Sequence, residues 1–443
     1  MRKFLLSSAV ATGATLIIAN GANAQPVKPA APGTIAVHVN GYFQFGLDDV
    51  GSTFNNYQGA KLNPVTTNGE LRLYPGFDAT TVGGISYGTQ VELRTAFTSA
   101  GKGVNSGTGS LYVRRAYGYV GTADYGYVRF GQTDGAFGLM QTGVVEAFGD
   151  GDQFRTVTTS TLYTVPTRAI PAQFVYADQG SLYTTDKVLL ISPAVEEPYL
   201  AGKFSGMASY EPNSNGLKEG YGSSCASAAP TASGACASLS SLGVGYTSTQ
   251  ATERKNTFDI AAKYEVKLGG FANKLSVGYL EGSPINYTGT YNAANPYRLD
   301  QLQVMQVGVE TTYKSLFIGG DAITLGANAK WGQTLDNYAP KPIGARDGVT
   351  YIVGADYVVG PYVLGASFWD GQTAGNYNQF KAGTEARTLS EYGIAAGGNY
   401  VIGKDLSLYL QYLYGHAHQP GNTNLLKGNS QMQVVGAGGT FKW

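Results

Sequence analysis

The sequence lacks several features that define common classes of protein. Lys and Arg total 30 and Asp and Glu also total 30, so no net positive charge would attract nucleic acid. Beyond Ile18, no apolar run approaches the ~18 residues that a membrane-spanning helix needs. Only two cysteines and three histidines are present, and no histidine is placed with a nucleophile or an acid as a catalytic pair requires. We therefore expect no nucleic-acid-binding protein, no helical membrane protein, no enzyme and no metal or cofactor.

The beginning of the sequence contains the three parts of a secretory signal peptide in order. A positive charge at Arg2 is followed by a largely apolar stretch over residues 4–18 and by an A-x-A cleavage site that ends at Ala24. We therefore predict that residues 1–24 are a signal peptide that is removed on export. A short membrane anchor is the alternative, but the stretch is too short and too rich in small residues to span a membrane well.

Apolar residues alternate with polar ones over long stretches of the chain. In residues 34–48 the apolar side chains fall on one face, while His38, Gln44 and Asp48 fall on the other. The same alternation recurs later, and period two sustained for this length indicates β-strands rather than helices. Further stretches of this kind are residues 85–97, 257–268 and 406–414.

The gaps between the predicted strands alternate between short turns and long loops. Short turns on one rim and long loops on the other are typical of outer-membrane barrels, in which only alternate residues face lipid. We therefore predict an all-β fold over residues 34–443, a transmembrane antiparallel β-barrel, with residues 25–33 as a periplasmic lead-in. The sixteen strands are predicted at residues 34–48, 69–79, 85–97, 110–121, 125–133, 183–193, 200–211, 256–268, 274–283, 301–313, 316–332, 348–358, 361–370, 388–401, 405–415 and 429–443.

Tyrosines recur toward the ends of the outward faces, where the ring can lie in lipid and the hydroxyl in water. The ordinary preference of strands for aromatic residues is the alternative explanation. The chain also ends on an outward aromatic residue, Trp443, which resembles the signal read by the barrel assembly machinery of bacterial outer membranes. The tyrosines predicted to face outward are Tyr117, Tyr119, Tyr279, Tyr313, Tyr357, Tyr362, Tyr400 and Tyr414.

Two stretches resemble the general outer-membrane porins of Gram-negative bacteria, of the alphaproteobacterial type. Residues 113–131 look like the family's strand–turn–strand signature, and residues 146–152 look like its constriction-loop motif. The sequence departs from the family at Gln132, where Arg is frequent, and by the insertion of Ala147. The resemblance implies a homotrimer in the outer membrane that lets small hydrophilic solutes and ions diffuse through a water-filled channel. It also implies that the loop near residues 101–110 latches neighbouring subunits.

The connection after the fifth strand, predicted at residues 134–182, is longer than the ~12–15 residues usual for a loop without its own secondary structure. In the family that the chain resembles, this loop folds inward and narrows the pore. The resemblance therefore implies that Glu146, Asp150 and Asp152 face the lumen from this loop.

Strand parity predicts which residues line the opposite wall. Arg94 and Arg114 share the polar faces of adjacent strands at similar height, with Arg72 and Glu92 beside them. Opposed rows of charge across a narrow gap create a transverse field that favours polar solutes. A purely structural pairing of these arginines with glutamates is the alternative. Arg115 has the opposite parity, so we expect it near a rim or in a subunit interface.

Three points stay open in the sequence. Cys225 and Cys236 fall in a long extracellular loop predicted at residues 212–255, where a disulfide or free thiols are both compatible with export. A solute-selective channel for sugars or anions is an alternative function. The inward parity of several tyrosines favours sugars, and a non-transport structural or adhesive barrel is a further alternative. Those tyrosines are Tyr42, Tyr74, Tyr112 and Tyr409.

Overall fold

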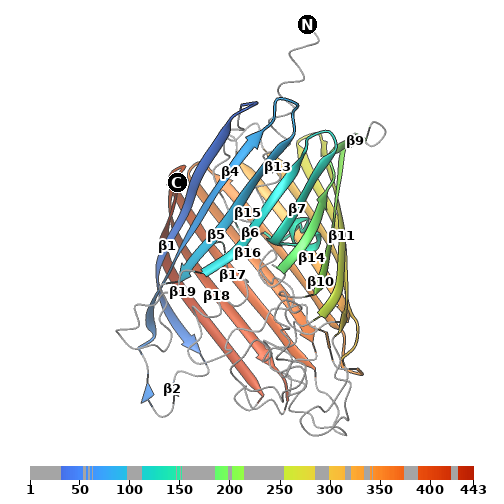
Figure 1. Cartoon of the computed structure of the whole chain (residues 1–443). Helices are drawn as coiled ribbons and strands as arrows, with labels where there is room; N and C mark the ends of the chain where they lie inside the picture. The colour runs from blue at the N-terminus through green and yellow to red at the C-terminus, as the bar shows by residue number, and fades with distance from the viewer. Residues whose placement is uncertain are drawn as a thin grey trace, which may run out of the picture.

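The chain forms a closed antiparallel β-barrel with strongly tilted strands (Figure 1). Successive strands of the wall pair with each other, and β2 and β3 form a separate two-stranded sheet between β1 and β4 in the chain. The last strand, β19, returns to pair with β1 through contacts such as Phe43 opposite Phe441. The short strands β8 and β9 both pair with β10 and occupy one place in the wall, so the seventeen strands of the sheet fill sixteen positions. The predicted fold class and strand number are confirmed.

The computed structural model describes part of the chain, and the elements lie within it. The described residues are 31–52, 56–57, 60–61, 63–96, 112–145, 147–149, 151, 185–197, 202–213, 254–284, 299–314, 321–333, 340–341, 343–373, 388–420 and 428–443. The elements are β1 (Ile35–Ser52), β2 (Asn56–Tyr57), β3 (Ala60–Lys61), β4 (Val65–Thr80), β5 (Ser86–Ala96), β6 (Tyr112–Thr122), β7 (Gly126–Thr133), α2 (Ala136–Leu139), β8 (Thr185–Ile191), β9 (Val195–Glu197), β10 (Gly202–Asn213), β11 (Arg254–Leu268), β12 (Phe271–Pro284), β13 (Leu302–Lys314), β14 (Ala322–Gln333), β15 (Gly348–Val359), β16 (Tyr362–Thr373), β17 (Leu389–Gly403), β18 (Leu406–His418) and β19 (Asn429–Lys442).

The sixth predicted strand, at residues 183–193, is interrupted in the structure. It appears as β8 and β9 with an irregular stretch between them that contains Pro193, which has no N–H to donate to a ladder. The hydroxyl of Ser192 accepts a hydrogen bond from the backbone N–H of Gly206 at 2.8 Å, and so a side chain replaces a backbone acceptor at the break.

The two faces of the wall differ as the alternation predicts. On β1, Val37 is 79% exposed on the outer face, whereas Gln44 on the inner face is 3% exposed. Apolar side chains on the outside meet lipid, and polar side chains on the inside surround a lumen that sixteen strands leave open to water. Among the described residues, no helix is long and apolar enough to cross a membrane.

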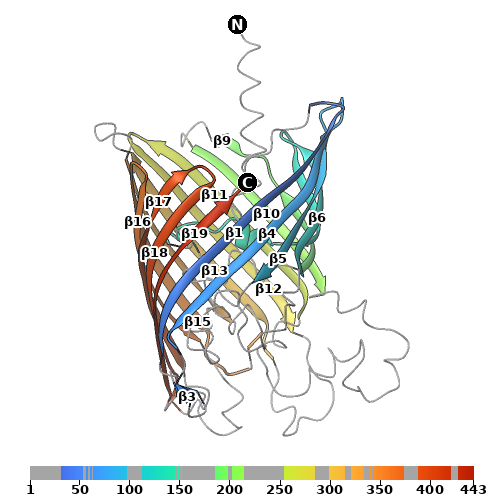
Figure 2. The same ribbon diagram turned by 90° about the vertical axis from the view of Figure 1, so that its left-hand side faces the viewer.

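Outward tyrosines gather near the rim with the short turns. Tyr362 and Tyr400 pack with ring centroids 5.3 Å apart, and Tyr313 packs on Phe271 at 4.9 Å. The start of β1 and the C-terminus lie at this same end of the barrel (Figure 2). There Trp443 exchanges backbone hydrogen bonds with Gly41 of β1, at 3.0 and 3.2 Å.

The prediction that Tyr117 and Tyr119 face outward is wrong. The hydroxyl of Tyr117 donates to Gln90 and that of Tyr119 donates to Asp78, and both partners lie on the inner wall. The register between β5 and β6 shifts after Glu92, which inserts one extra residue into β6. Because side chains alternate with period two, this bulge turns the following residues of β6 to the other face.

Several predictions fall outside the described residues. They are the signal peptide at 1–24, the loop near 101–110 and the pair Cys225 and Cys236. These remain predictions, as does most of the proposed lead-in at 25–33.

An outward charge in the middle of a strand should destabilise the barrel. Val353 lies on the outer face of β15, between Ala327 and Phe368 on the adjoining strands. We expect Val353→Arg to lower the free energy of unfolding by ~2–4 kcal/mol, and Val349→Arg near the strand's end by about 1 kcal/mol or less. Urea unfolding in lipid vesicles, followed by tryptophan fluorescence, measures both. Equal losses would contradict a midplane position for Val353.

Candidate functional site

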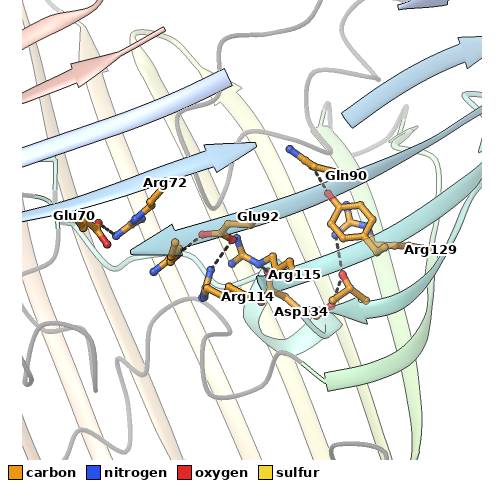
Figure 3. A network of polar contacts seen from close by, with 11 residues as sticks. Glu70, Arg72, Gln90, Glu92, Arg114, Arg115, Arg129 and Asp134 are labelled. Atoms are coloured by element: carbon orange, nitrogen blue, oxygen red, sulfur yellow. Dashed lines mark hydrogen bonds and ion pairs between the residues drawn. The ribbon is translucent and has the colours of Figure 1, made fainter. Parts of the chain in front are cut away.

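Four charged side chains meet on the inner wall where β5 pairs with β6, and we call them the arginine cluster (Figure 3). The carboxylate of Glu92 accepts a hydrogen bond from the Nε of Arg94. Its Oε2 also accepts hydrogen bonds from the Nη1 of Arg114 at 3.1 Å and the Nη1 of Arg115 at 2.6 Å. All four residues are at most 8% exposed. One carboxylate therefore holds three guanidinium groups together.

Arg115 joins the cluster because of the bulge in β6. Glu92 lies opposite Arg115 and Leu93 lies opposite Val113, so Arg114 is the extra residue and both arginines turn inward. The prediction that Arg115 lies near a rim or in a subunit interface is therefore wrong. Simple alternation fails across an inserted residue, and the adjacency of the two arginines is the sole sign of it in the sequence.

The basic wall continues onto β4. Arg72 lies directly opposite Arg94 in the register of β4 and β5, so the two arginines share one face of the wall. Arg72 also forms an ion pair with Glu70 on its own strand, and its guanidinium lies 5.1 Å from the ring centroid of Tyr42. The structural pairing proposed as the alternative is therefore present together with the ladder.

Arg129 extends the basic wall onto β7. Its guanidinium lies 4.2 Å from the ring centroid of Tyr117, and its Nη1 donates to the hydroxyl of Thr133 at 3.3 Å. On β4 to β7 and at the residue after β7, the described inner wall thus carries more arginines than carboxylates near them. The arginines are Arg72, Arg94, Arg114, Arg115 and Arg129, and the carboxylates are Glu70, Asp78, Glu92 and Asp134.

The chain leaves β7 and turns across the inside of the barrel. We call residues 134–145 and 147–149 the constriction segment. It begins with α2, where Ala136 and Met140 pack with Leu189 and Ala261 of the wall. The inward course predicted for this loop is therefore confirmed for its first part.

Side chains of the wall hold the backbone of the constriction segment in place. Backbone polar groups that leave water need partners, and here strands from β11 to β17 supply them. Two aspartates accept backbone N–H groups, namely Asp259 from Phe137 at 2.9 Å and Asp356 from Ala147 at 3.1 Å. The segment's carbonyls accept from Gln306 at Phe137 (2.6 Å), Asn328 at Thr142 (2.8 Å), Ser367 at Val145 (2.8 Å) and Asn399 at Gly149 (2.9 Å).

Glycines on the wall make a trough for this segment. A Cβ at Gly308 would collide with the carbonyl oxygen of Thr142, and one at Gly365 would collide with the ring of Phe148. Gly143 of the segment has φ of +85° and approaches the backbone of the wall, so it too requires the absence of a side chain. The further trough glycines are Gly278, Gly326 and Gly354.

Buried ions fix the beginning of the constriction segment. The Oδ2 of Asp134 lies 2.7 Å from the Nε of Arg115 in an ion pair, which connects the segment directly to the arginine cluster. Close by on the wall, the Oε2 of Glu211 lies 3.1 Å from the Nη2 of Arg254 and 3.9 Å from the Nζ of Lys187. Each of these charges has an opposite charge beside it, which offsets the cost of burial.

The acidic half of the predicted site cannot be placed. Glu146, Asp150 and Asp152 lie outside the described residues, so their position opposite the arginines stays a prediction. No motif or strand period in the sequence marks the glycine trough, Asp134 or Asp356. Among the described residues there is no group of three or more metal-ligating side chains.

The arrangement is suited to sorting solutes by charge and size. Fixed guanidinium groups lie on one side of the lumen, and a segment held by its backbone crosses the other side. Charges fixed around a narrow water-filled gap act on each solute that passes, without a covalent step.

Comparison with known proteins adds a family match. The family model described as Gram-negative porin matches residues 7–420, which include every strand from β1 to β18. No curated protein matches the chain. A double mutant of the porin of Rhodopseudomonas blastica is 16% identical, with a TM-score of 0.48, and the match covers 92% of this chain and 100% of that one. The anion-selective porin from Comamonas acidovorans is 11% identical, with a TM-score of 0.49 and coverages of 93% and 100%.

A side chain placed in the trough should displace the constriction segment. We expect Gly308→Val to leave the barrel folded, because valine suits a strand, but to raise the single-channel conductance about twofold as the lumen widens. Planar-bilayer recordings measure this change. Gly206→Val on the outer face, where a Cβ meets no atom closer than 3.7 Å, is the matched control and should leave the conductance unchanged. Equal conductance of the two variants would contradict a trough that seats the segment.

Proposed function

The chain belongs to the Gram-negative porin family, and from that premise we propose that the arginine cluster and the constriction segment form the selectivity filter of the channel. The protein is an outer-membrane β-barrel for the passive diffusion of small hydrophilic solutes and ions. The observation that carries the proposal is the fixed position of three guanidinium groups around Glu92, on the wall across from the segment. Acidic residues of the loop, namely Glu146, Asp150 and Asp152, would complete a transverse field.

The excess of arginines over nearby carboxylates supports a moderate preference for anions. Glu92 is shared among three arginines, and Asp134 beside Arg115 adds a second negative charge, so three positive charges face two negative ones. Water in the lumen screens these charges, and the preference should therefore weaken as the salt concentration rises.

A channel that selects sugars is the second candidate, favoured by tyrosines on the inner wall. Tyr42, Tyr74 and Tyr409 face inward as parity predicts, while the side chain of Tyr112 lies outside the described residues. Tyr117 and Tyr119 add two further inward rings. A structural or adhesive barrel remains a third candidate, and it would require a closed lumen.

Membership of the porin family leads us to propose two further features. A homotrimer would bury part of the outer face, and the outward C-terminal Trp443 would serve as the signal for the barrel assembly machinery. The hydrogen bonds between Trp443 and Gly41 support a defined position for that terminal residue.

The proposal is tested by single-channel conductance of the refolded protein in a planar bilayer. We expect a stable, large conductance that closes in three equal steps, one for each subunit of a trimer. Block by added maltose would favour the sugar-selective candidate. A protein shown by circular dichroism to be folded as a barrel but without any conductance would leave the structural or adhesive candidate.

Removing part of the arginine cluster should shift ion preference toward cations. We expect the double substitution Arg94→Ala and Arg114→Ala to lower the anion-to-cation permeability ratio roughly threefold, because two positive charges leave while Glu92 keeps Arg115 as partner. The reversal potential in a salt gradient measures the ratio. Arg346→Ala, which removes an exposed arginine bonded to Thr388, is the control. An unchanged potential in the double variant would show that these arginines do not line the filter.

A further inference from the structure

A second group of basic side chains lies on the inner wall, near the rim with the short turns. It consists of Lys263 and Lys267 on β11, Lys274 on β12 and Lys314 on β13, and we call it the lysine patch. Short turns mark the periplasmic rim of an outer-membrane barrel, so the patch lies at the periplasmic mouth.

Strand alternation shows that the lysine patch faces the lumen. Asp259, which bonds the constriction segment inside the barrel, has the same parity on β11 as Lys263 and Lys267. The residues between them on β11, such as Tyr264 and Val266, therefore face outward. From inside the lumen, the lysines cannot bind lipid headgroups on the outer face of the barrel.

Carboxylates near the lysine patch do not balance it. Glu265 lies opposite Lys274, which in turn lies opposite Glu310 in the register of the three strands. The Nζ of Lys274 lies 2.6 Å from Glu310, so these two charges neutralise each other. Lys267 and Lys314 are exposed at the mouth, and the four lysines of β11 to β13 face two glutamates.

The lysine patch and the arginine cluster lie on different parts of the wall and at different depths. The arginine cluster is on β5 and β6, and β12 lies six wall positions from β5 and five from β6. An anion that leaves the arginines toward the periplasm therefore meets positive charge again, farther round the wall.

We propose that the lysine patch is a second station for small anions at the periplasmic mouth of the channel. This proposal rests on the proposed function, since it requires an open lumen. The ligands are small anions such as chloride, phosphate and small carboxylates. Exposed ammonium groups attract these anions by their charge and need no shaped pocket. The patch raises the local anion concentration on the side where solutes leave the filter.

The test reverses the charge of the two exposed lysines. We expect Lys267→Glu with Lys314→Glu to lower the chloride-to-potassium permeability ratio roughly threefold in about 0.1 M salt. The same double variant should have little effect in about 1 M salt, where the Debye length falls to ~3 Å. The unitary conductance should remain, which separates this result from a failure of the channel assignment. Potassium phosphate in place of chloride should show the same direction of change.

A matched control reverses a charge elsewhere on the same rim. Lys404, in the turn between β17 and β18, has a side chain that is 81% exposed, and its Nζ lies 4.0 Å from Asp405. Lys404→Glu should leave the permeability ratio nearly unchanged. An unchanged ratio in the double variant, or an equal shift in the Lys404 variant, would overturn the proposal and leave only a general effect of charge at the rim.

Discussion

The requirement that every backbone N–H and C=O within lipid find a partner governs this structure. A sheet satisfies it only when it closes, because an open edge would leave a row of unpaired groups in hydrocarbon. The pairing of β19 with β1 supplies that closure. Closure with sixteen wall positions then creates the lumen, and the lumen provides the inner face on which charged residues can lie at the depth of the membrane.

Inside the closed wall, two unlike kinds of contact position the arginine cluster and the constriction segment. The arginine cluster depends on charge, since a single carboxylate of Glu92 gathers three guanidinium groups. The constriction segment depends instead on close approach, since glycines such as Gly308 let its backbone reach hydrogen-bonding side chains of the wall. The ion pair between Arg115 and Asp134 joins the two, so the basic wall and the beginning of the segment form one connected unit.

The sequence predicts the barrel well and the inner wall in part. Alternation identified the strands, and parity brought Arg72, Arg94 and Arg114 to one wall, because both depend on a local period of two. Strand parity predicts the wrong face for Arg115. A bulge depends on how two strands pair, and the alternation within one strand does not reveal it. The glycine trough could not be predicted either, because each of its glycines lies on a different strand and gains its meaning from a segment far away in the chain.

That distance along the chain has a consequence for how the channel forms. Asp259 lies 122 residues after Phe137, which it binds, and Asn399 lies 250 residues after Gly149. Contacts between residues so far apart in sequence are slow to form, because a long loop must close before they contribute. The seats of the constriction segment exist only after the later strands have joined the wall. The narrow part of the lumen therefore depends on nearly the whole chain, because strands that follow the constriction segment by 100 residues or more provide its seats.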